Sequence, residues 1–210
     1  MSYIIKNPGV VGNLLLEHLL LIGTALAIAV SISLPIGLLV TRDRWLKVPA
    51  IGLLGVLYTI PSLALIILLV PIFGLNPASV IAGMVIYAQV VLVRNLVVGL
   101  ESIPTTITEA ARGMGMNPWQ RWWWVQVPLI LPIFIAGLRI SAIVGIGIAT
   151  IGAKFNAGGL GVLLFDGIAQ NRYDKIWAGA IAVSLLAFTI NGGLLALEWV
   201  ANPSRRIKKT

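Results

Sequence analysis

Long apolar runs separated by short polar connections make up most of this chain. Five such runs can be delimited, at about residues 14–40, 50–73, 78–100, 129–151 and 176–200. Each run is close to the roughly 20 residues that an α-helix needs to cross the hydrocarbon core of a bilayer. The pattern therefore predicts an all-α membrane protein with about five transmembrane helices. It leaves no room for a sizeable soluble domain, so we expect residues 1–210 to form one transmembrane domain.

The basic residues are unevenly divided between the two sides that five spans would create. On one side lie Arg42, Arg44, Lys47, Arg112, Arg121, Arg205, Arg206, Lys208 and Lys209. The other side carries Lys6, Lys154, Arg172 and Lys175. Because cytoplasmic connections carry the excess of Lys and Arg, the first side is predicted to be cytoplasmic. We therefore expect the N-terminus outside and the C-terminus inside, with residues 201–210 forming a basic cytoplasmic tail.

Composition supports a multi-pass protein of the cell membrane. The chain is 59% hydrophobic and only 10% charged, whereas about a quarter of the residues of a soluble domain are charged. The net charge of +8 is dispersed among apolar runs instead of being gathered on one polar face, which argues against nucleic acid as a partner. The first run is too long for a cleaved signal peptide and lacks a small-residue cleavage site, so we expect a retained span.

Residues for catalysis or metal binding are scarce. The chain has no cysteine and a single histidine, His18, which follows Glu17 and is expected to be a structural group. No G-x-x-x-x-G-K segment is present, so we expect no ATP binding by that route. We therefore expect no enzymatic activity and no cofactor bound by this chain. A transporter built this way needs an external energy source or works as a passive pore.

A polar and basic insert separates the third and fourth runs, over about residues 101–127. Its motif is Glu109-Ala110-Ala111, three residues, Gly115, nine residues, Val125, one residue, then Val127-Pro128. Thr105, Thr106 and Thr108 are predicted to cap a short helix that Pro118 ends. Trp122, Trp123 and Trp124 would lie at the headgroup level, and Pro128 would open the next span.

A glycine-rich segment lies between the fourth and fifth runs, at residues 149–168. Gly158, Gly159 and Gly161 cannot comfortably continue a helix, and a short apolar piece follows them. A re-entrant or outer-surface elbow is predicted. Irregular backbone at membrane depth is tolerated where it is buried in protein or lines a cavity, so the elbow could border a substrate path. A glycine cluster that only packs helices is the alternative.

These motifs resemble those of the permeases of glycine betaine, carnitine and choline (osmoprotectant) ABC importers, from about Leu19 to Glu198. The resemblance rests on the Glu-Ala-Ala insert, on Pro128-Leu with Ala136-Gly-Leu-Arg139, and on Ala149-Thr150 with Ala157-Gly-Gly-Leu-Gly161. It implies the type I importer fold. It also implies cytoplasmic ABC ATPase subunits that hold ATP and Mg²⁺, a second permease copy or a paralogous permease, and an extracytoplasmic substrate-binding protein. The ATPase-coupling residues implied are Glu109, Ala110, Ala111, Gly113, Gly115, Met116 and Pro118.

Three alternatives remain open at this point. Methionine-importer permeases share about five spans, a Glu-Ala-Ala loop and a similar glycine-rich turn, so a methionine-type permease is the nearest competitor. A small channel or carrier that works without ATP belongs to a different class, and in it the Glu-Ala-Ala insert would be incidental. A membrane anchor without transport activity would show no flux.

Several residues within the runs are candidates for the translocation path, namely Arg139, Thr150, Gly158, Gly159, Gly161 and Tyr87. Arg139 lies near the bilayer centre, where an arginine should face the bundle or a wet cavity. It could meet a substrate carboxylate, but pairing with backbone carbonyls is the preferred interpretation. Tyr87 could contact a quaternary ammonium group, although the selective aromatic cage of this family belongs to the binding protein.

Structural roles are expected for the remaining ionisable residues and for the prolines of the spans. Arg94, Glu101 and Glu198 are expected to snorkel to the cytoplasmic interface. Pro35, Pro61, Pro71 and Pro132 offer helix kinks.

Overall fold

A computed structural model describes residues 2–202, and over this range the ordered elements are all helical. The helices are α1 (Ser2–Lys6), α2 (Pro8–Arg42), α3 (Arg44–Thr59), α4 (Ser62–Phe73), α5 (Pro77–Glu101), α6 (Thr105–Gly113), α7 (Pro118–Arg121), η1 (Trp122–Gln126), α8 (Val127–Gly152), η2 (Ala153–Phe155), α9 (Gly161–Ala169) and α10 (Tyr173–Ala201). Four stretches are long and apolar enough to cross a membrane: α2, α5, the α7-to-η2 stretch built around α8, and α10. The predicted all-α membrane fold is confirmed.

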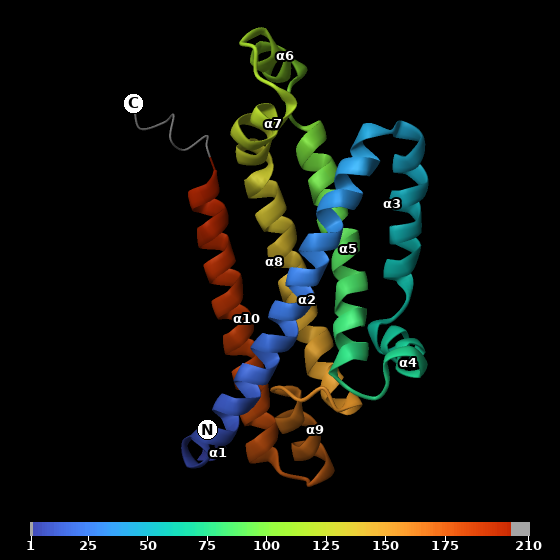
Figure 1. Ribbon diagram of the computed structural model, residues 1–210. Coiled ribbons are helices and arrows are strands. Elements are labelled where there is room, and N and C mark those ends of the chain that lie inside the picture. The colour runs from blue at the N-terminus through green and yellow to red at the C-terminus, as the bar shows by residue number, and fades with distance from the viewer. Residues whose placement is uncertain (1, 203–210) are drawn as a thin grey trace.

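The two ends of the helix bundle carry different parts of the chain (Figure 1). The N-terminus, α4 and α9 lie at one end, and α6, α7 and the C-terminal end of α10 lie at the other, together with the connection from α2 to α3. The two termini of the described chain are therefore at opposite ends, as an odd number of crossings requires. The basic connections predicted to share a side do share an end, while residues 203–210 of the basic tail lie outside the described residues.

The second apolar run, predicted as one span at residues 50–73, is bent in the middle, at the Pro61 where a helix kink was predicted. Helices α3 and α4 meet at a bend of 98°, and the described chain has five spans when this bent pair counts as one. Pro61 explains the break because a residue that precedes proline avoids the α-helical conformation, and Ile60 is extended at φ −67° and ψ 125°. The hydroxyl of Tyr87 donates a hydrogen bond to the Ile60 carbonyl and so satisfies the broken end.

Helix α5 lies at the centre of the bundle, and α10 lies at its periphery. In α5, 56% of the most apolar window is buried, compared with 6% in α10. Helix α5 packs mainly against α2 and α8, and small residues allow these close approaches. A Cβ atom built on Gly37 of α2 would lie 2.5 Å from a methyl carbon of Leu96, and one built on Gly137 of α8 would lie 2.4 Å from the Asn95 amide nitrogen. Such pairs fix the distance between helices. In lipid, the hydrophobic effect does not drive helices together, so close packing of this kind has to hold them.

Candidate functional site: the coupling elbow and the outer glycine turn

Helices α6, α7 and η1 form an elbow that projects beyond the bundle at the end opposite the N-terminus (Figure 1). Helix α6 packs mainly against α7. Glu109 and Ala110 are exposed, whereas Ala111 is only 2% exposed. The elbow therefore presents the Glu109 carboxylate and the small Ala110 side chain outward, whereas the Ala111 side chain is buried.

Gly115 ends α6 through backbone geometry. Its φ of 79° is left-handed, and two backbone hydrogen bonds close the turn, from Gly115 N to Arg112 O at 2.9 Å and from Met116 N to Ala111 O at 3.1 Å. This pair of bonds is the Schellman arrangement that ends many helices, and it favours glycine. A Cβ at Gly115 would meet nothing within 4 Å, so the glycine is required for its conformation and not for space.

The chain then returns toward the membrane through a second capped helix. The Asn117 side chain accepts a hydrogen bond from Gln120 N, and the Gln120 side chain accepts one from Asn117 N, each at 2.9 Å. With Pro118 at its first turn, α7 begins with a full capping box. Pro118 therefore starts α7, and the prediction that it ends α6 is wrong.

The predicted threonine caps of α6 are also wrong. Pro104 occupies the N-cap position without a side-chain hydrogen bond, and the Thr108 hydroxyl donates to the Thr105 carbonyl inside the helix at 2.8 Å. The tryptophan run forms a π-helix, and the ring of Trp123 meets that of Trp119 from α7 edge to face, with centroids 5.6 Å apart. Pro128 lies in the first turn of α8, which confirms its predicted position.

At the opposite end, helix α2 holds the glycine turn through two side chains. A Glu17 carboxylate oxygen accepts a hydrogen bond from Gly159 N at 2.8 Å, and Nδ1 of His18 accepts one from Leu160 N at 3.2 Å. Gly158 and Gly159 have φ values of 77° and 79°. A Cβ at Gly158 would lie 2.4 Å from the Glu17 carboxylate and one at Gly159 would lie 2.8 Å from His18. We call this arrangement the Glu17–His18 clamp.

Gly161 makes an equally close contact, with helix α8. A Cβ at this position would lie 2.0 Å from the Thr150 carbonyl oxygen, and Gly159 and Gly161 are both buried. Within this chain, these glycines serve helix packing, which favours the packing interpretation over an open path. The sequence signal for the Glu17–His18 clamp was a Glu-His pair inside an apolar run, which predicted a structural role for His18 but not its partner.

Replacing Gly161 by alanine is expected to destabilise the protein because the new methyl group would overlap a backbone oxygen that cannot move without shifting α8. Overpacking of this kind costs about 1–3 kcal/mol. The thermal unfolding of the purified transporter would measure it. Gly147→Ala is the matched control, since Gly147 is an exposed glycine of α8 where an added Cβ would meet nothing within 4 Å. Equal unfolding temperatures for the two variants would contradict the packing role.

Arg139 pairs with α10, and not with backbone carbonyls as predicted. Its Nη2 atom lies 3.3 Å from a carboxylate oxygen of Glu198, and its Nη1 donates to the Asn191 side-chain oxygen at 3.3 Å. The side chains of Arg139 and Glu198 are each 27% exposed. The prediction that Glu198 simply snorkels to the interface is therefore corrected, because this carboxylate is the counter-ion of Arg139.

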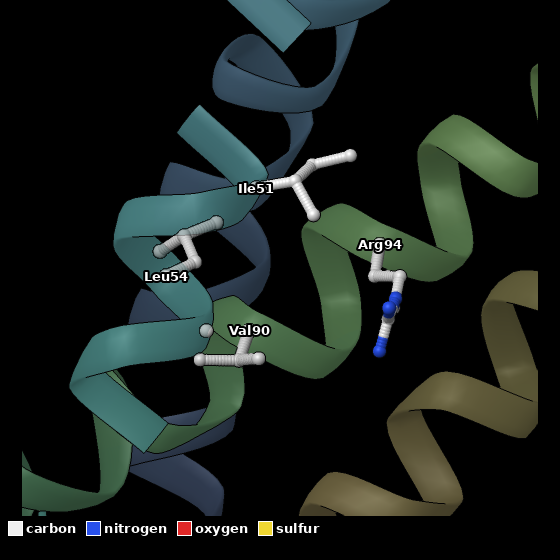
Figure 2. Close-up of a pocket in the computed structure, with 5 residues that line it drawn as sticks. Ile51, Leu54, Val90 and Arg94 are labelled. Atoms are coloured by element: carbon white, nitrogen blue, oxygen red, sulfur yellow. The ribbon is translucent and has the colours of Figure 1, made fainter. Parts of the chain in front are cut away.

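The other two predicted snorkelling residues lie on α5. Glu101 forms an ion pair with Lys47 at 2.5 Å, and both side chains are partly exposed. Arg94 is exposed and lines a small cleft between α3 and α5 together with Ile51, Leu54 and Val90 (Figure 2). The cleft has about 50 Å³ of space, far below the roughly 300 Å³ of a small-molecule site.

The predicted path residues do not form one site in the single chain. Thr150 lies with Gly158, Gly159 and Gly161 at the end that carries the N-terminus. Arg139 faces α10, and Tyr87 braces the break between α3 and α4. The structure also shows no cluster of three or more His, Cys, Asp or Glu side chains suited to a metal ion among residues 2–202.

Comparison with known proteins agrees with this arrangement. The chain is 36% identical over 208 residues to the osmoprotectant import permease protein OsmW of Salmonella typhimurium, with 97% of each chain covered. It is 30% identical to the glycine betaine/carnitine/choline transport system permease protein OpuCB of Bacillus subtilis, covering 97% of this chain and 94% of that one. These relatives are permeases, in agreement with the prediction of a transport subunit and not an enzyme.

A solved structure shows the same fold. A chain of the MetNI methionine ABC transporter, in an inward-facing conformation, superposes with a TM-score of 0.79 at 20% identity, covering 93% of this chain and 98% of that chain. The predicted type I importer permease fold is confirmed. Residues 33–202 match the family described as the inner membrane component of binding-protein-dependent transport systems. The chain therefore belongs to this family of multi-pass membrane permeases.

Proposed function

We propose that this chain is the permease subunit of an ATP-driven importer for quaternary-ammonium osmoprotectants such as glycine betaine, carnitine or choline. Full-length similarity to the osmoprotectant permeases supports the substrate class. The projecting elbow is the observation that carries the coupling to a motor, because Glu109 and Ala110 lie exposed on a short helix beyond the end of the bundle, where a partner can reach them. The methionine transporter shares the fold at 20% identity and says nothing of this chain's substrate.

The proposed motor is a separate cytoplasmic ABC ATPase that holds ATP and Mg²⁺. Its contact surface on this chain comprises Glu109, Ala110, Gly113, Gly115, Met116 and Pro118, with Ala111 beneath them. This surface lies at the end that carries the basic connections, so the positive-inside rule places it in the cytoplasm. The N-terminus and α9 then face outward, where a substrate-binding protein can dock.

The proposed mechanism is alternating access between two permease subunits, either two copies of this chain or this chain and a paralogue. ATP-driven closure of the ATPases moves the two elbows, and the attached bundles open outward to receive substrate. In this scheme Thr150 and the turn of Gly158, Gly159 and Gly161, which is packed against α2 and α8, border the outer end of the path and hold its shape. Tyr87 and Arg139 hold the moving helices in register, through the Ile60 carbonyl and Glu198 respectively.

Uptake of labelled glycine betaine tests this proposal. The chain would be expressed with its ATPase and binding protein, and carnitine, choline and methionine would be added as competitors. We expect ATP-dependent uptake that the quaternary amines reduce and methionine does not. Glu109→Lys should abolish it, since the charge on the exposed face of α6 would be reversed, while the protein still inserts into the membrane.

The alternatives give different results in the same assay. Uptake reduced only by methionine would keep the ATP-driven mechanism and overturn the substrate class. Flux that does not require ATP would indicate a channel or carrier, and wild-type uptake by Glu109→Lys would contradict the role of the elbow.

A further inference from the structure

A pocket of about 450 Å³ lies at the outer end of the molecule, between η2, the glycine turn and α9. Its lining residues are Ala153, Lys154, Asn156, Gly158, Val162, Phe165, Asp166 and Ala169. The volume lies within the range of about 300–1,000 Å³ that is typical of small-molecule sites. Figure 1 places α9 at the end opposite the elbow, on the side proposed to face the binding protein.

An ammonium group already occupies the aromatic surface of this pocket. The Nζ atom of Lys154 lies over the Phe165 ring, 4.7 Å from its centroid, within the cation–π range. Lys154 is exposed and Phe165 is half-buried, so the contact is a weak surface interaction that a competing cation can displace. Tyr3 also lies beneath cations, Arg172 and Lys175, but it is only 9% exposed and lies outside this pocket.

The charges of the pocket suit a cation that has no N–H group. Asp166 lines the pocket next to Phe165, and within residues 2–202 its carboxylate forms no ion pair. A quaternary ammonium group cannot donate a hydrogen bond, so it is held by an aromatic face and by a nearby negative charge. Once displaced, Lys154 would remain close enough to attract the carboxylate of a zwitterion.

The pocket is also preformed by its backbone. Asn156 and Gly158, on its rim, have left-handed φ values of 55° and 77°. The Glu17–His18 clamp bonds the next two residues, at Gly159 and Leu160, to helix α2. A fixed rim lowers the ordering cost of binding a small ligand.

We infer that this pocket receives the quaternary ammonium group of the transported substrate at the outer mouth, on the Phe165 ring and beside Asp166, in place of the Lys154 ammonium. The inference deepens the proposed function and rests on it for the delivery of substrate. Its binding chemistry can be tested without transport.

Saturation-transfer NMR on the permease–ATPase complex in nanodiscs, without the binding protein, provides that test. The probes are choline and its neutral isostere 3,3-dimethylbutan-1-ol, in which carbon replaces the nitrogen. We expect transfer to the choline methyl groups and little to the isostere. Phe165→Leu and Asp166→Asn should each weaken choline binding about two- to fivefold, while Lys154→Met should strengthen it by removing the competing ammonium. Phe188→Leu is the control, because Phe188 is an exposed phenylalanine of α10.

Equal transfer to choline and to the isostere would overturn the inference, as would choline binding that is unchanged by both Phe165→Leu and Asp166→Asn. If either result accompanied normal uptake of glycine betaine, the pocket assignment alone would fail. Choline binding that depends on Phe165 and Asp166 would support the pocket even if uptake proved to be competed only by methionine, in which case the proposed function would fail.

Discussion

Arg139→Gln is expected to prevent recovery of an assembled transporter, because it leaves the Glu198 carboxylate without its counter-ion between α8 and α10. Both side chains are about three-quarters shielded in the single chain, and the surrounding medium is proposed to be lipid. A charge at the centre of a span costs roughly 2.5–3.5 kcal/mol even on the lower scales, and the unpaired Glu198, near the C-terminal end of α10, should cost a part of that. Because membrane domains are only marginally stable, a loss of this size should appear as aggregation or a strongly reduced yield of complex.

The double variant Arg139→Gln with Glu198→Gln separates pairing from a substrate contact. Removing both charges should restore much of the assembly, since neither partner is then left buried and charged. Size-exclusion chromatography and thermal unfolding of the purified complex would measure both variants. If Arg139→Gln assembled normally but lost uptake, the helix-locking role would be wrong and a role in the path would be favoured.

Gly115→Val is expected to lower ATP-dependent uptake at least about tenfold while leaving the protein in the membrane. The left-handed conformation at φ 79° costs an L-residue about 1–2 kcal/mol, and a β-branched side chain makes it a genuine outlier. Relief of that strain would undo the two bonds that end α6 and would move Glu109 relative to α7. Uptake, together with ATPase activity stimulated by the loaded binding protein, would report the loss of coupling.

Two substitutions in the same turn serve as controls. Gly115→Asn should remain close to wild type, because asparagine tolerates the left-handed region. Gly113→Ala should leave α6 folded, since Gly113 is helical and a Cβ there would meet nothing within 4 Å of this chain. A loss of uptake in this variant would therefore report contact with the ATPase and not a change of the turn. Wild-type uptake by Gly115→Val would show that the turn is not required for coupling.

Much of the fold could be predicted because lipid imposes a simple rule on sequence. A span must satisfy its backbone within a helix, so apolar length alone delimits α2, α5, α8 and α10. The run at residues 50–73 shows the limit of this rule. Pro61 predicts a kink, but hydropathy does not give the size of the bend, and no local pattern shows that the Tyr87 hydroxyl of another helix satisfies the Ile60 carbonyl. The end of α6 was mispredicted, because the backbone turn at Gly115, and not Pro118, ends this helix.

The place of the elbow between the third and fourth runs could be predicted from its motif, but the predicted threonine caps and the stop at Pro118 are wrong. The features that do cap it are nevertheless local. Gly115 lies four residues after Ala111, and the Asn117-to-Gln120 capping box closes within four residues. Contacts between distant segments could not be predicted in this way. Arg139 was expected to meet backbone carbonyls, and Glu198 was placed at the interface by its position near the end of a run.

The amino-acid sequence by itself determined the class of protein, the number and order of the membrane crossings, the side that carries the basic connections, and the presence of a capped elbow. Each of these follows from hydropathy, from charge count or from bonds that close within a few residues. Only the tertiary structure decided that α2 clamps the glycine turn 142 positions away, that Glu198 neutralises Arg139, and that Lys154 and Phe165 share a pocket with Asp166. Such partners are chosen by how the helices pack, because a side chain in a span takes whichever group the neighbouring helix brings within reach, and no local pattern records which group that is.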